Sequence, residues 1–174
     1  TVSGEITTTG DKTGGLAGVG YNVTATNCNA DVKINCPKAD NGGLFGRLQG
    51  ENVLTGCKTK SIIENSNESN ARTGSLVGWN CATKTTVTDC HVLEGSSVTV
   101  TKPSNVSGFI AFADNENLNT VLTITNCSSK ATVTSEGAAN IAGLVASVGY
   151  AGTTVNITNH ASGPKPKNIK SIQI

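Results

Sequence analysis

Large aromatic side chains are almost missing from this sequence, and this limits the kind of core that it can build. Only 3% of the 174 residues are aromatic, there is no methionine, and Trp79 is the single tryptophan. Hydrophobic residues still make up 36% of the chain, enough for one domain with a continuous core. We therefore expect a narrow core in which small and branched side chains are stacked.

Charged residues and long apolar runs are also scarce. Charged residues make up 14% of the chain and the formal net charge is +1, whereas a nucleic-acid surface needs a basic stripe. The one cationic cluster, Lys165, Lys167 and Lys170, is expected to be solvated. No run approaches the roughly 20 apolar residues of a membrane span. We predict neither a nucleic-acid partner nor membrane insertion in this segment. Because the first residue is not methionine, we also expect a processed protein or a piece of a longer one.

Self-similarity is the strongest signal in the sequence. A first anchor of the type Gly-Leu-x-Gly occurs five times, at Gly15-Leu16-Ala17-Gly18, Gly43-Leu44-Phe45-Gly46, Ser75-Leu76-Val77-Gly78, Gly108-Phe109-Ile110-Ala111 and Gly143-Leu144-Val145-Ala146. A second anchor follows each of them, at Thr26-Asn27-Cys28, Thr55-Gly56-Cys57, Thr88-Asp89-Cys90, Thr125-Asn126-Cys127 and Thr158-Asn159-His160. The first anchors lie 28, 32, 33 and 35 residues apart. Two independent anchors that stay in register over five units indicate a repeat protein.

Each unit has the chemistry of short strands. Residues 122–125 alternate apolar and polar side chains, and Gly, Asn, Asp and Ser interrupt the chain at short intervals. Glu5-Ile6-Thr7 resembles the third, weaker segment of an earlier unit. A unit of about 30 residues cannot bury a strand face alone, so stacked units must share a core. We predict an all-β fold, a parallel β-helix (β-solenoid) of about five three-stranded coils over residues 1–163, with residues 164–174 as a C-terminal strand or linker.

Stacking of the units places equivalent residues in columns. The first strand should turn inward Leu16, Leu44, Leu76, Phe109 and Leu144, and the second strand Ala25, Leu54, Val87, Ile124 and Ile157. A corner follows at residue types that tolerate a left-handed backbone: Asn27, Gly56, Asp89, Asn126 and Asn159. Just past this corner comes a further structural column of Cys28, Cys57, Cys90, Cys127 and His160.

Two outward columns are candidate contact surfaces. Strict alternation turns outward an apolar stripe of Ala17, Phe45, Val77, Ile110 and Val145. We expect another chain, an adjoining domain or self-association to cover this stripe, unless a kink at the neighbouring glycines turns both columns inward. The second column is the Thr face, formed by Thr26, Thr55, Thr88, Thr125 and Thr158 and flanked two residues earlier by Thr24, Thr86 and Thr123. Flat Thr ranks on β-solenoids resemble those of ice-binding proteins, although Thr is also common on solvated strand faces.

No column collects the groups that catalysis needs. Carbohydrate-cleaving β-helices use paired carboxylates, or acid-bound cations beside a basic residue, on one face. The acidic residues share no column, Arg47 and Arg72 are the only arginines, and Trp79, Tyr21 and Tyr150 form at most a small aromatic rim. A line of thiols one strand apart cannot surround a zinc ion tetrahedrally. We predict no catalytic residues, no metal site and no cofactor, with a polysaccharide-binding or polysaccharide-cleaving β-helix as an alternative.

The cysteines fit small buried side chains better than a disulfide framework, because most of them recur once per unit. Three disulfides remain open: Cys28 with Cys36 or Cys81 with Cys90 across a corner, and Cys57 with Cys90 between neighbouring coils. Glycosylation sequons begin at Asn22, Asn67, Asn105, Asn126 and Asn156. Their number is what the composition gives by chance, so they permit glycosylation without indicating it.

The anchors resemble those of GLUG-motif repeats, whose units combine Gly-Gly-Leu-x-Gly with a later Asn-Cys. The best matches are Gly14-Gly15-Leu16-Ala17-Gly18 with Asn27-Cys28 and Asn41-Gly42-Gly43-Leu44-Phe45-Gly46 with Cys57. Later units depart from the pattern, since Ala111 replaces the final glycine in the fourth and His160 replaces the cysteine in the fifth. Such repeats occur in stalks and adhesive regions of large bacterial surface proteins. The resemblance spans residues 14–163 and implies a non-enzymatic, extracellular or cell-surface module that is structural or adhesive, with a protein as its expected partner and a glycan as an alternative.

Overall fold

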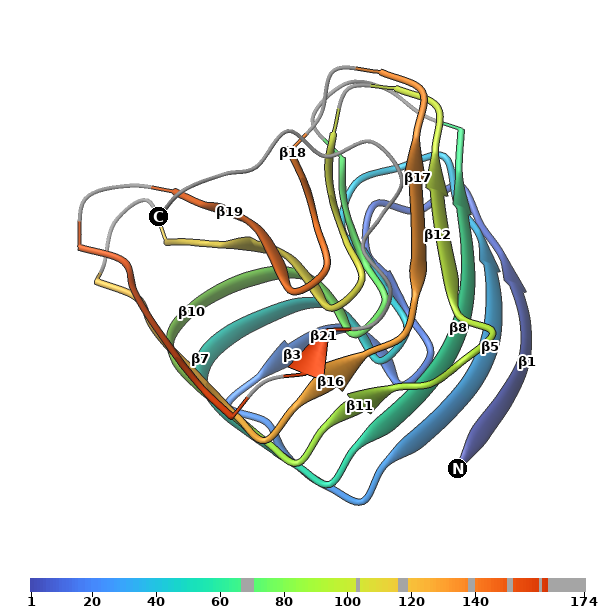
Figure 1. Cartoon of the computed structure of the whole chain (residues 1–174). Helices are drawn as coiled ribbons and strands as arrows, with labels where there is room; N and C mark the ends of the chain where they lie inside the picture. The colour runs from blue at the N-terminus through green and yellow to red at the C-terminus, as the bar shows by residue number, and fades with distance from the viewer. Residues whose placement is uncertain are drawn as a thin grey trace.

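The chain folds as a parallel β-solenoid of about four turns with three parallel sheets (Figure 1). The computed structural model describes residues 1–66, 71–102, 104–115, 119–137, 140–149, 152–159 and 161–162. Within these residues there is no helix, and neighbouring strands come from successive passes of the chain. The predicted all-β parallel solenoid is confirmed, with about four turns instead of the expected five coils. The predicted C-terminal segment 164–174 lies outside the described residues.

Three sheets, called A, B and C, run along the solenoid. Sheet A contains β1 (Val2–Thr7), β5 (Asn29–Asn35), β8 (Lys58–Asn65), β11 (His91–Val92), β12 (Ser97–Val100), β16 (Ser128–Ser129), β17 (Thr132–Ser135) and β21 (Ala161–Ser162). Sheet B contains β2 (Thr13–Gly14), β6 (Asn41–Gly42), β9 (Arg72–Gly74), β13 (Asn105–Ser107) and β18 (Asn140–Ala142). Sheet C contains β3 (Ala17–Tyr21), β4 (Thr24–Thr26), β7 (Phe45–Thr55), β10 (Val77–Thr88), β14 (Ile110–Ala113), β15 (Val121–Thr125), β19 (Val145–Val148) and β20 (Thr154–Thr158). Each coil visits sheets B, C and A in that order, and β1 precedes the first coil.

The strand β1 occupies the place that its sequence predicts. It pairs with β5 along its whole length, with Glu5 opposite Lys33 and Ile6 opposite Ile34. The segment Glu5-Ile6-Thr7 is therefore equivalent to the third segment of the following coil.

Each pass through sheet C bends about half-way along. The pairing of β10 with β7 shifts between Ala82 and Lys84, and the other passes are broken there into two strands. The first half of sheet C, which contains β3, β14 and β19, meets sheet B at an angle (Figure 1). The second half, which contains β4, β15 and β20, runs to the corner with sheet A (Figure 1). The two halves of sheet C thus present two different outer surfaces.

The core lies between the sheets and is narrow, as the composition suggests. In the middle coils Leu44, Leu76 and Phe109 are fully buried, and in the outer coils Leu16 and Leu144 pack against the same cluster. In the second half of sheet C the buried residues are Ala25, Leu54, Val87 and Ile124, while Ile157 in the last coil is 44% exposed. A smaller cluster between sheets A and B consists of Val98, Val100, Val106 and Val133. Side chains of the outer coils are less buried because they have a neighbouring coil on one side only.

The apolar stripe does not face outward, so this expectation is wrong. Phe45, Val77 and Ile110 are at most 4% exposed and belong to the main core, while Ala17 and Val145 pack against it. The reason is the bend between sheets B and C. The two residues before Phe45 belong to neither β6 nor β7, so strict alternation does not continue through them. Both columns turn inward at this corner, and no partner is needed to cover the stripe.

Glycines allow sheets B and C to approach each other at the same corner. A Cβ atom on Gly46 would lie 2.6 Å from the carbonyl oxygen of Asp40, and one on Gly78 would lie 2.8 Å from that of Arg72. Such distances are too short for a side chain, because both contacts are with backbone atoms. The final glycine of the first anchor is therefore needed because two backbone segments approach each other closely at this point.

Candidate functional site

The Thr face forms one continuous column on the second half of sheet C. Its members occupy paired positions on consecutive strands: Thr26, Thr55, Thr88, Thr125 and Thr158. The first and last of these threonines are exposed and the three between them are half-buried. In the first four strands the preceding residue, Ala25, Leu54, Val87 or Ile124, is buried in the core, so the hydroxyl and methyl groups of the column point away from it.

A flanking column runs beside the Thr face, two residues earlier in each strand. It contains Thr24, Val53, Thr86, Thr123 and Asn156, again in register. Parallel strands are about 4.8 Å apart, and residues two apart along a strand are separated by about 6.6 Å. Together the columns form a flat rectangular array without a charged side chain. Charges border the array on both sides: the exposed Asp89 directly follows Thr88 at the corner, and Glu51 and Lys84 belong to the next column in the other direction.

The corner between sheets C and A keeps these columns in register. The predicted left-handed backbone is confirmed, since φ is 53° at Asn27, Asp89 and Asn126, 52° at Asn159 and 64° at Gly56. A Cβ on Gly56 would lie 2.3 Å from the side-chain oxygen of Asn27, so the glycine leaves room for the residue stacked on it. Each described coil turns at this corner with the same backbone geometry. The strand that precedes the corner therefore ends at the equivalent residue in each of these coils.

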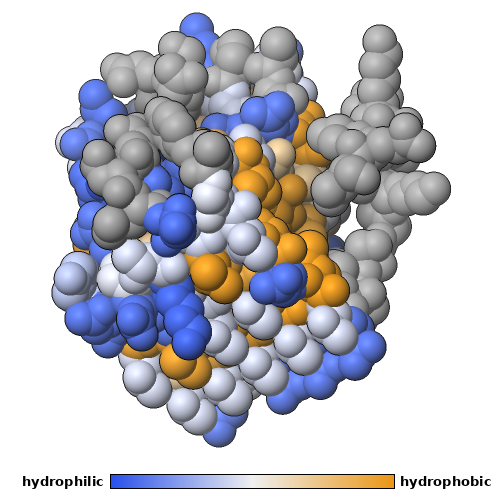
Figure 2. All heavy atoms as spheres, turned by 90° about the vertical axis from the view of Figure 1, so that its left-hand side faces the viewer, coloured by the Kyte–Doolittle hydropathy of each residue, from blue (hydrophilic) through white to orange (hydrophobic). Residues whose placement is uncertain are grey.

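The outer surface of sheet A has a different character. Charged side chains from neighbouring strands pair across it, with Lys33 3.5 Å from Glu5 and Lys60 3.9 Å from Asp31. These four side chains are between 44% and 63% exposed, which is typical of a solvated surface. Figure 2 views the side that contains the bend of sheet C, and it shows rows of residues of intermediate hydropathy below an apolar area. The regular uncharged surface is thus a property of sheet C and not of every sheet.

A charged and aromatic cluster joins sheet B to the first half of sheet C. The Asp40 carboxylate, with a side chain only 1% exposed, accepts hydrogen bonds from both arginines. Arg47 donates from Nε at 2.9 Å and also from Nη2, while Arg72 donates from Nη1 at 3.1 Å. Both guanidinium groups lie over the ring of Trp79, at 4.0 and 3.8 Å from its centroid. The indole N–H donates to Asp114 at 2.9 Å.

Sequence reasoning missed this cluster, although one signal could have found it. Arg47 and Trp79 each lie three residues after the leucine-type position of the first anchor, as does Phe112, and the three are register partners. Alignment on the anchors therefore places them in one column. Asp40 and Asp114 lie elsewhere in their units, so only the fold brings these carboxylates to the column. The suggested aromatic rim does not form from Tyr21 and Trp79, because the two lie in different columns, and Tyr150 lies outside the described residues.

The cysteine column follows the left-handed corner. Cys57, Cys90 and Cys127 are buried and Cys28 is half-buried, whereas His160 lies outside the described residues. The disulfide between Cys28 and Cys36 does not fit, because the extended strand β5 separates the two residues. Most of β10 likewise separates Cys81 from Cys90. All six cysteines are free thiols in this structure.

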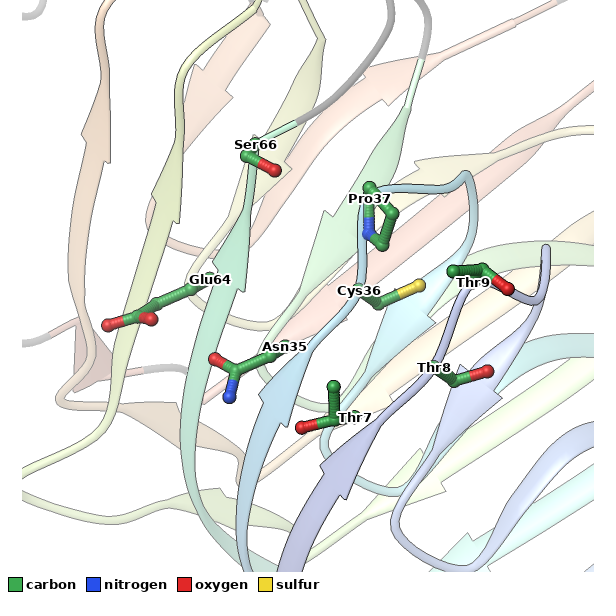
Figure 3. Close-up of a pocket in the computed structure, with 8 residues that line it drawn as sticks. All are labelled: Thr7, Thr8, Thr9, Asn35, Cys36, Pro37, Glu64 and Ser66. Atoms are coloured by element: carbon green, nitrogen blue, oxygen red, sulfur yellow. The ribbon is translucent and has the colours of Figure 1, made fainter.

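A cavity of about 750 Å³ opens near the ends of β1, β5 and β8 (Figure 3). It is lined by Thr7, Thr8, Thr9, Asn35, Cys36, Pro37, Glu64 and Ser66. The Glu64 carboxylate points away from the threonines in Figure 3, and the Cys36 thiol lies 3.2 Å from the carbonyl oxygen of Gly10. The lining contains one carboxylate and no basic residue, so it lacks the acid–base pair that glycoside cleavage uses.

No known family model, curated protein or solved structure matches this chain. The resemblance to GLUG-motif repeats is therefore supported at the level of the β-solenoid fold only. Within the described ranges, no group of three or more His, Cys, Asp or Glu side chains is arranged to hold a metal ion. Nor do those ranges contain a helix of the length and hydropathy that crossing a membrane requires.

Proposed function

We propose that this chain is a non-enzymatic structural or adhesive module of an extracellular or cell-surface protein, and that the Thr face is its contact surface. The observation that carries the proposal is the in-register array of the Thr face and its flanking column. A flat array without charges suits an extended partner with its own repeat, such as a fibrous glycan or a second β-sheet surface. The extracellular location is supported by the resemblance to surface repeats and by the low content of charged residues.

The charged cluster supports a module without catalysis. Its arginines are held by Asp40, and Trp79 is 9% exposed, so the ring has no open face on which a sugar could stack. Buried and mutually paired charges of this kind connect neighbouring coils. We therefore assign the cluster to the rigidity of the solenoid rather than to chemistry on a substrate.

The proposal is tested by adsorption of the purified chain to insoluble cellulose, chitin and peptidoglycan, together with its self-association. Replacing both Thr88 and Thr125 by Lys places two ammonium groups in the middle of the Thr face. We expect this to weaken binding at least about tenfold, equivalent to about 1.4 kcal/mol, because the charges must be desolvated in the contact. The melting temperature should change little, since neither side chain is part of the core.

A matched control lies in the same two coils. Thr99 and Thr134 are register partners on the outer surface of sheet A, so the same double replacement by Lys there should leave binding unchanged. Equal losses from both pairs would show that the Thr face is not the contact surface. If the wild-type chain binds none of these surfaces and does not associate with itself, the adhesive function is wrong.

Ice binding is a second candidate, favoured by the two-dimensional regularity of the same array. An ordered layer of water needs evenly spaced hydroxyl and methyl groups and tolerates no charge. Val53 and Asn156 interrupt the flanking column but leave the Thr face complete. Thermal hysteresis and reshaping of ice crystals by the wild-type chain, both lost on replacing Thr88 and Thr125 by Lys, would favour this candidate over adhesion.

A further inference from the structure

The cysteine column brings thiols of neighbouring coils into contact. The backbone N–H of Cys57 donates to the sulfur of Cys90 at 3.4 Å, and the N–H of Cys90 donates to that of Cys127 at 3.4 Å. Each of these sulfurs thus lies against the cysteine of the preceding coil. The sulfur of Cys57 has the same relation to Cys28, whose backbone N–H and thiol both hydrogen-bond to it.

The spacing of the column fits a disulfide between adjacent coils. Thr26 pairs with Thr55 just before Cys28, and Asn29 pairs with Lys58 just after it. Cys28 and Cys57 are therefore opposite each other on neighbouring passes, where the Cα atoms of parallel strands are about 4.8 Å apart. Disulfides join Cα atoms at about 4.4–6.8 Å. A disulfide also needs Cβ atoms about 3.5–4.5 Å apart, so a bond between these two residues requires the two side chains and the adjoining backbone to move slightly closer.

The two thiols differ in access and in reactivity. Cys28 lies in the first coil, where β4 pairs with β7 only, and it is the half-buried member of the column. Cys57 is fully buried. The hydrogen bond from the Cys90 thiol, with further bonds from Cys28, lowers the pKa of Cys57 from 9.0 to about 6. This shift favours ionisation of Cys57 directly beside the accessible thiol of Cys28, while the protonated Cys57 thiol donates to the carbonyl oxygens of Ala25 and Thr55.

We propose that Cys28 and Cys57 form a redox pair that joins the first two coils when the chain meets a small-molecule disulfide such as glutathione disulfide. Cys28 attacks the glutathione disulfide, forms a mixed disulfide and releases one glutathione. The Cys57 thiolate then attacks the sulfur of Cys28, which forms the Cys28–Cys57 bond and breaks the bond to the second glutathione. The chain loses two electrons and two protons, and glutathione disulfide becomes two molecules of glutathione.

The proposal that the chain meets an oxidising environment rests on the proposed extracellular location. The reaction itself depends only on the cysteine column. It can therefore be tested in a defined buffer, apart from any test of the Thr face. The folded full chain is incubated with glutathione disulfide at pH 7.5, then analysed by intact mass and by mapping of linked peptides. We expect the wild-type chain to lose two hydrogens, to retain no glutathione and to yield a Cys28–Cys57 peptide.

Variants separate the two roles. Cys57→Ser should hold one glutathione on Cys28, because the resolving thiolate is missing, and Cys28→Ser should leave Cys57 unmodified while the chain is folded. Cys36→Ser, which removes a thiol beyond the far end of β5, should react like the wild type. Circular dichroism melting establishes that each variant is folded, and Cys28→Ala replaces Cys28→Ser if the latter is not. A wild-type chain that stays fully reduced, that accumulates the glutathione adduct, or that links other cysteines would overturn the proposal.

Discussion

At the scale of single residues, the fold depends on a few positions with one physical requirement each. The left-handed corner accepts Asn, Asp or Gly because these residue types tolerate φ near 53°. The final glycines of the first anchor are needed because two backbones approach within 3 Å of the position of their missing Cβ atoms. The inward column requires large apolar side chains, and its central member, Leu76, is fully buried.

Replacement of Leu76 by Asp should unfold the chain. The substitution places a carboxylate without a partner in the core, which costs at least several kcal/mol, about the stability of a whole domain. We expect the cooperative melt, followed by far-UV circular dichroism, to be lost. Ile62→Asp is the control, because Ile62 is 38% exposed on sheet A and should keep a melt. A Leu76→Asp chain that melts like the wild type would mean that this column is not the core.

At the scale of strands and sheets, equivalent strands stack in register, but the two halves of sheet C carry different kinds of side chain. The second half carries the uncharged Thr face, and the first half carries Arg47 and Trp79, which meet Asp40 and Arg72 from the side of sheet B. The bend between Ala82 and Lys84 separates the two halves. Because of this bend, one sheet can contribute both to the buried ion pairs of the Asp40 cluster and to the Thr face.

Replacement of Asp40 by Asn should be strongly destabilising. The change removes the charge that balances two partly buried arginines, and breaking a buried ion pair costs about 3–5 kcal/mol. Asn is the suitable replacement because Asp40 has φ of 57°, which Asn tolerates. Urea unfolding measures the loss. The control is Asp31→Asn, which removes an exposed pair with Lys60 and should cost less than about 1 kcal/mol. Equal effects of the two substitutions would show that the cluster does not stabilise the solenoid.

At the scale of the whole molecule, the strands that the structure describes form a stack in which each coil pairs with the coils next to it. Stability in such repeat proteins comes from each unit and from its interfaces with the next. The central coils have the most buried side chains, while the outer coils expose apolar residues such as Val19 at 45% and Ile157 at 44%. Opening of the solenoid should therefore begin at its ends.

The proposal that the chain is not an enzyme is tested on the whole molecule. The purified chain should release neither reducing nor unsaturated ends from a panel of plant, algal and microbial polysaccharides. We expect this because the carboxylates Asp40 and Asp114 are fully buried beside the arginines and Trp79. Release of ends that is lost on replacing Asp114 by Asn, in a variant that keeps its fold, would instead establish the polysaccharide-cleaving alternative.

The repeat by itself determined the all-β solenoid, the register of the Thr face and the left-handed corner. These features follow from residue types at equivalent positions, because stacking of similar units aligns similar residues whatever the exact path of the coil. Only the tertiary structure decided the fate of the apolar stripe and the existence of the Asp40 cluster. The stripe turned inward because alternation holds within a strand but not through the bend before Phe45. The cluster forms because sheets B and C meet at an angle that brings Asp40 and Arg72 against Arg47 and Trp79. These contacts join separate segments of the chain, so a local sequence pattern cannot predict them.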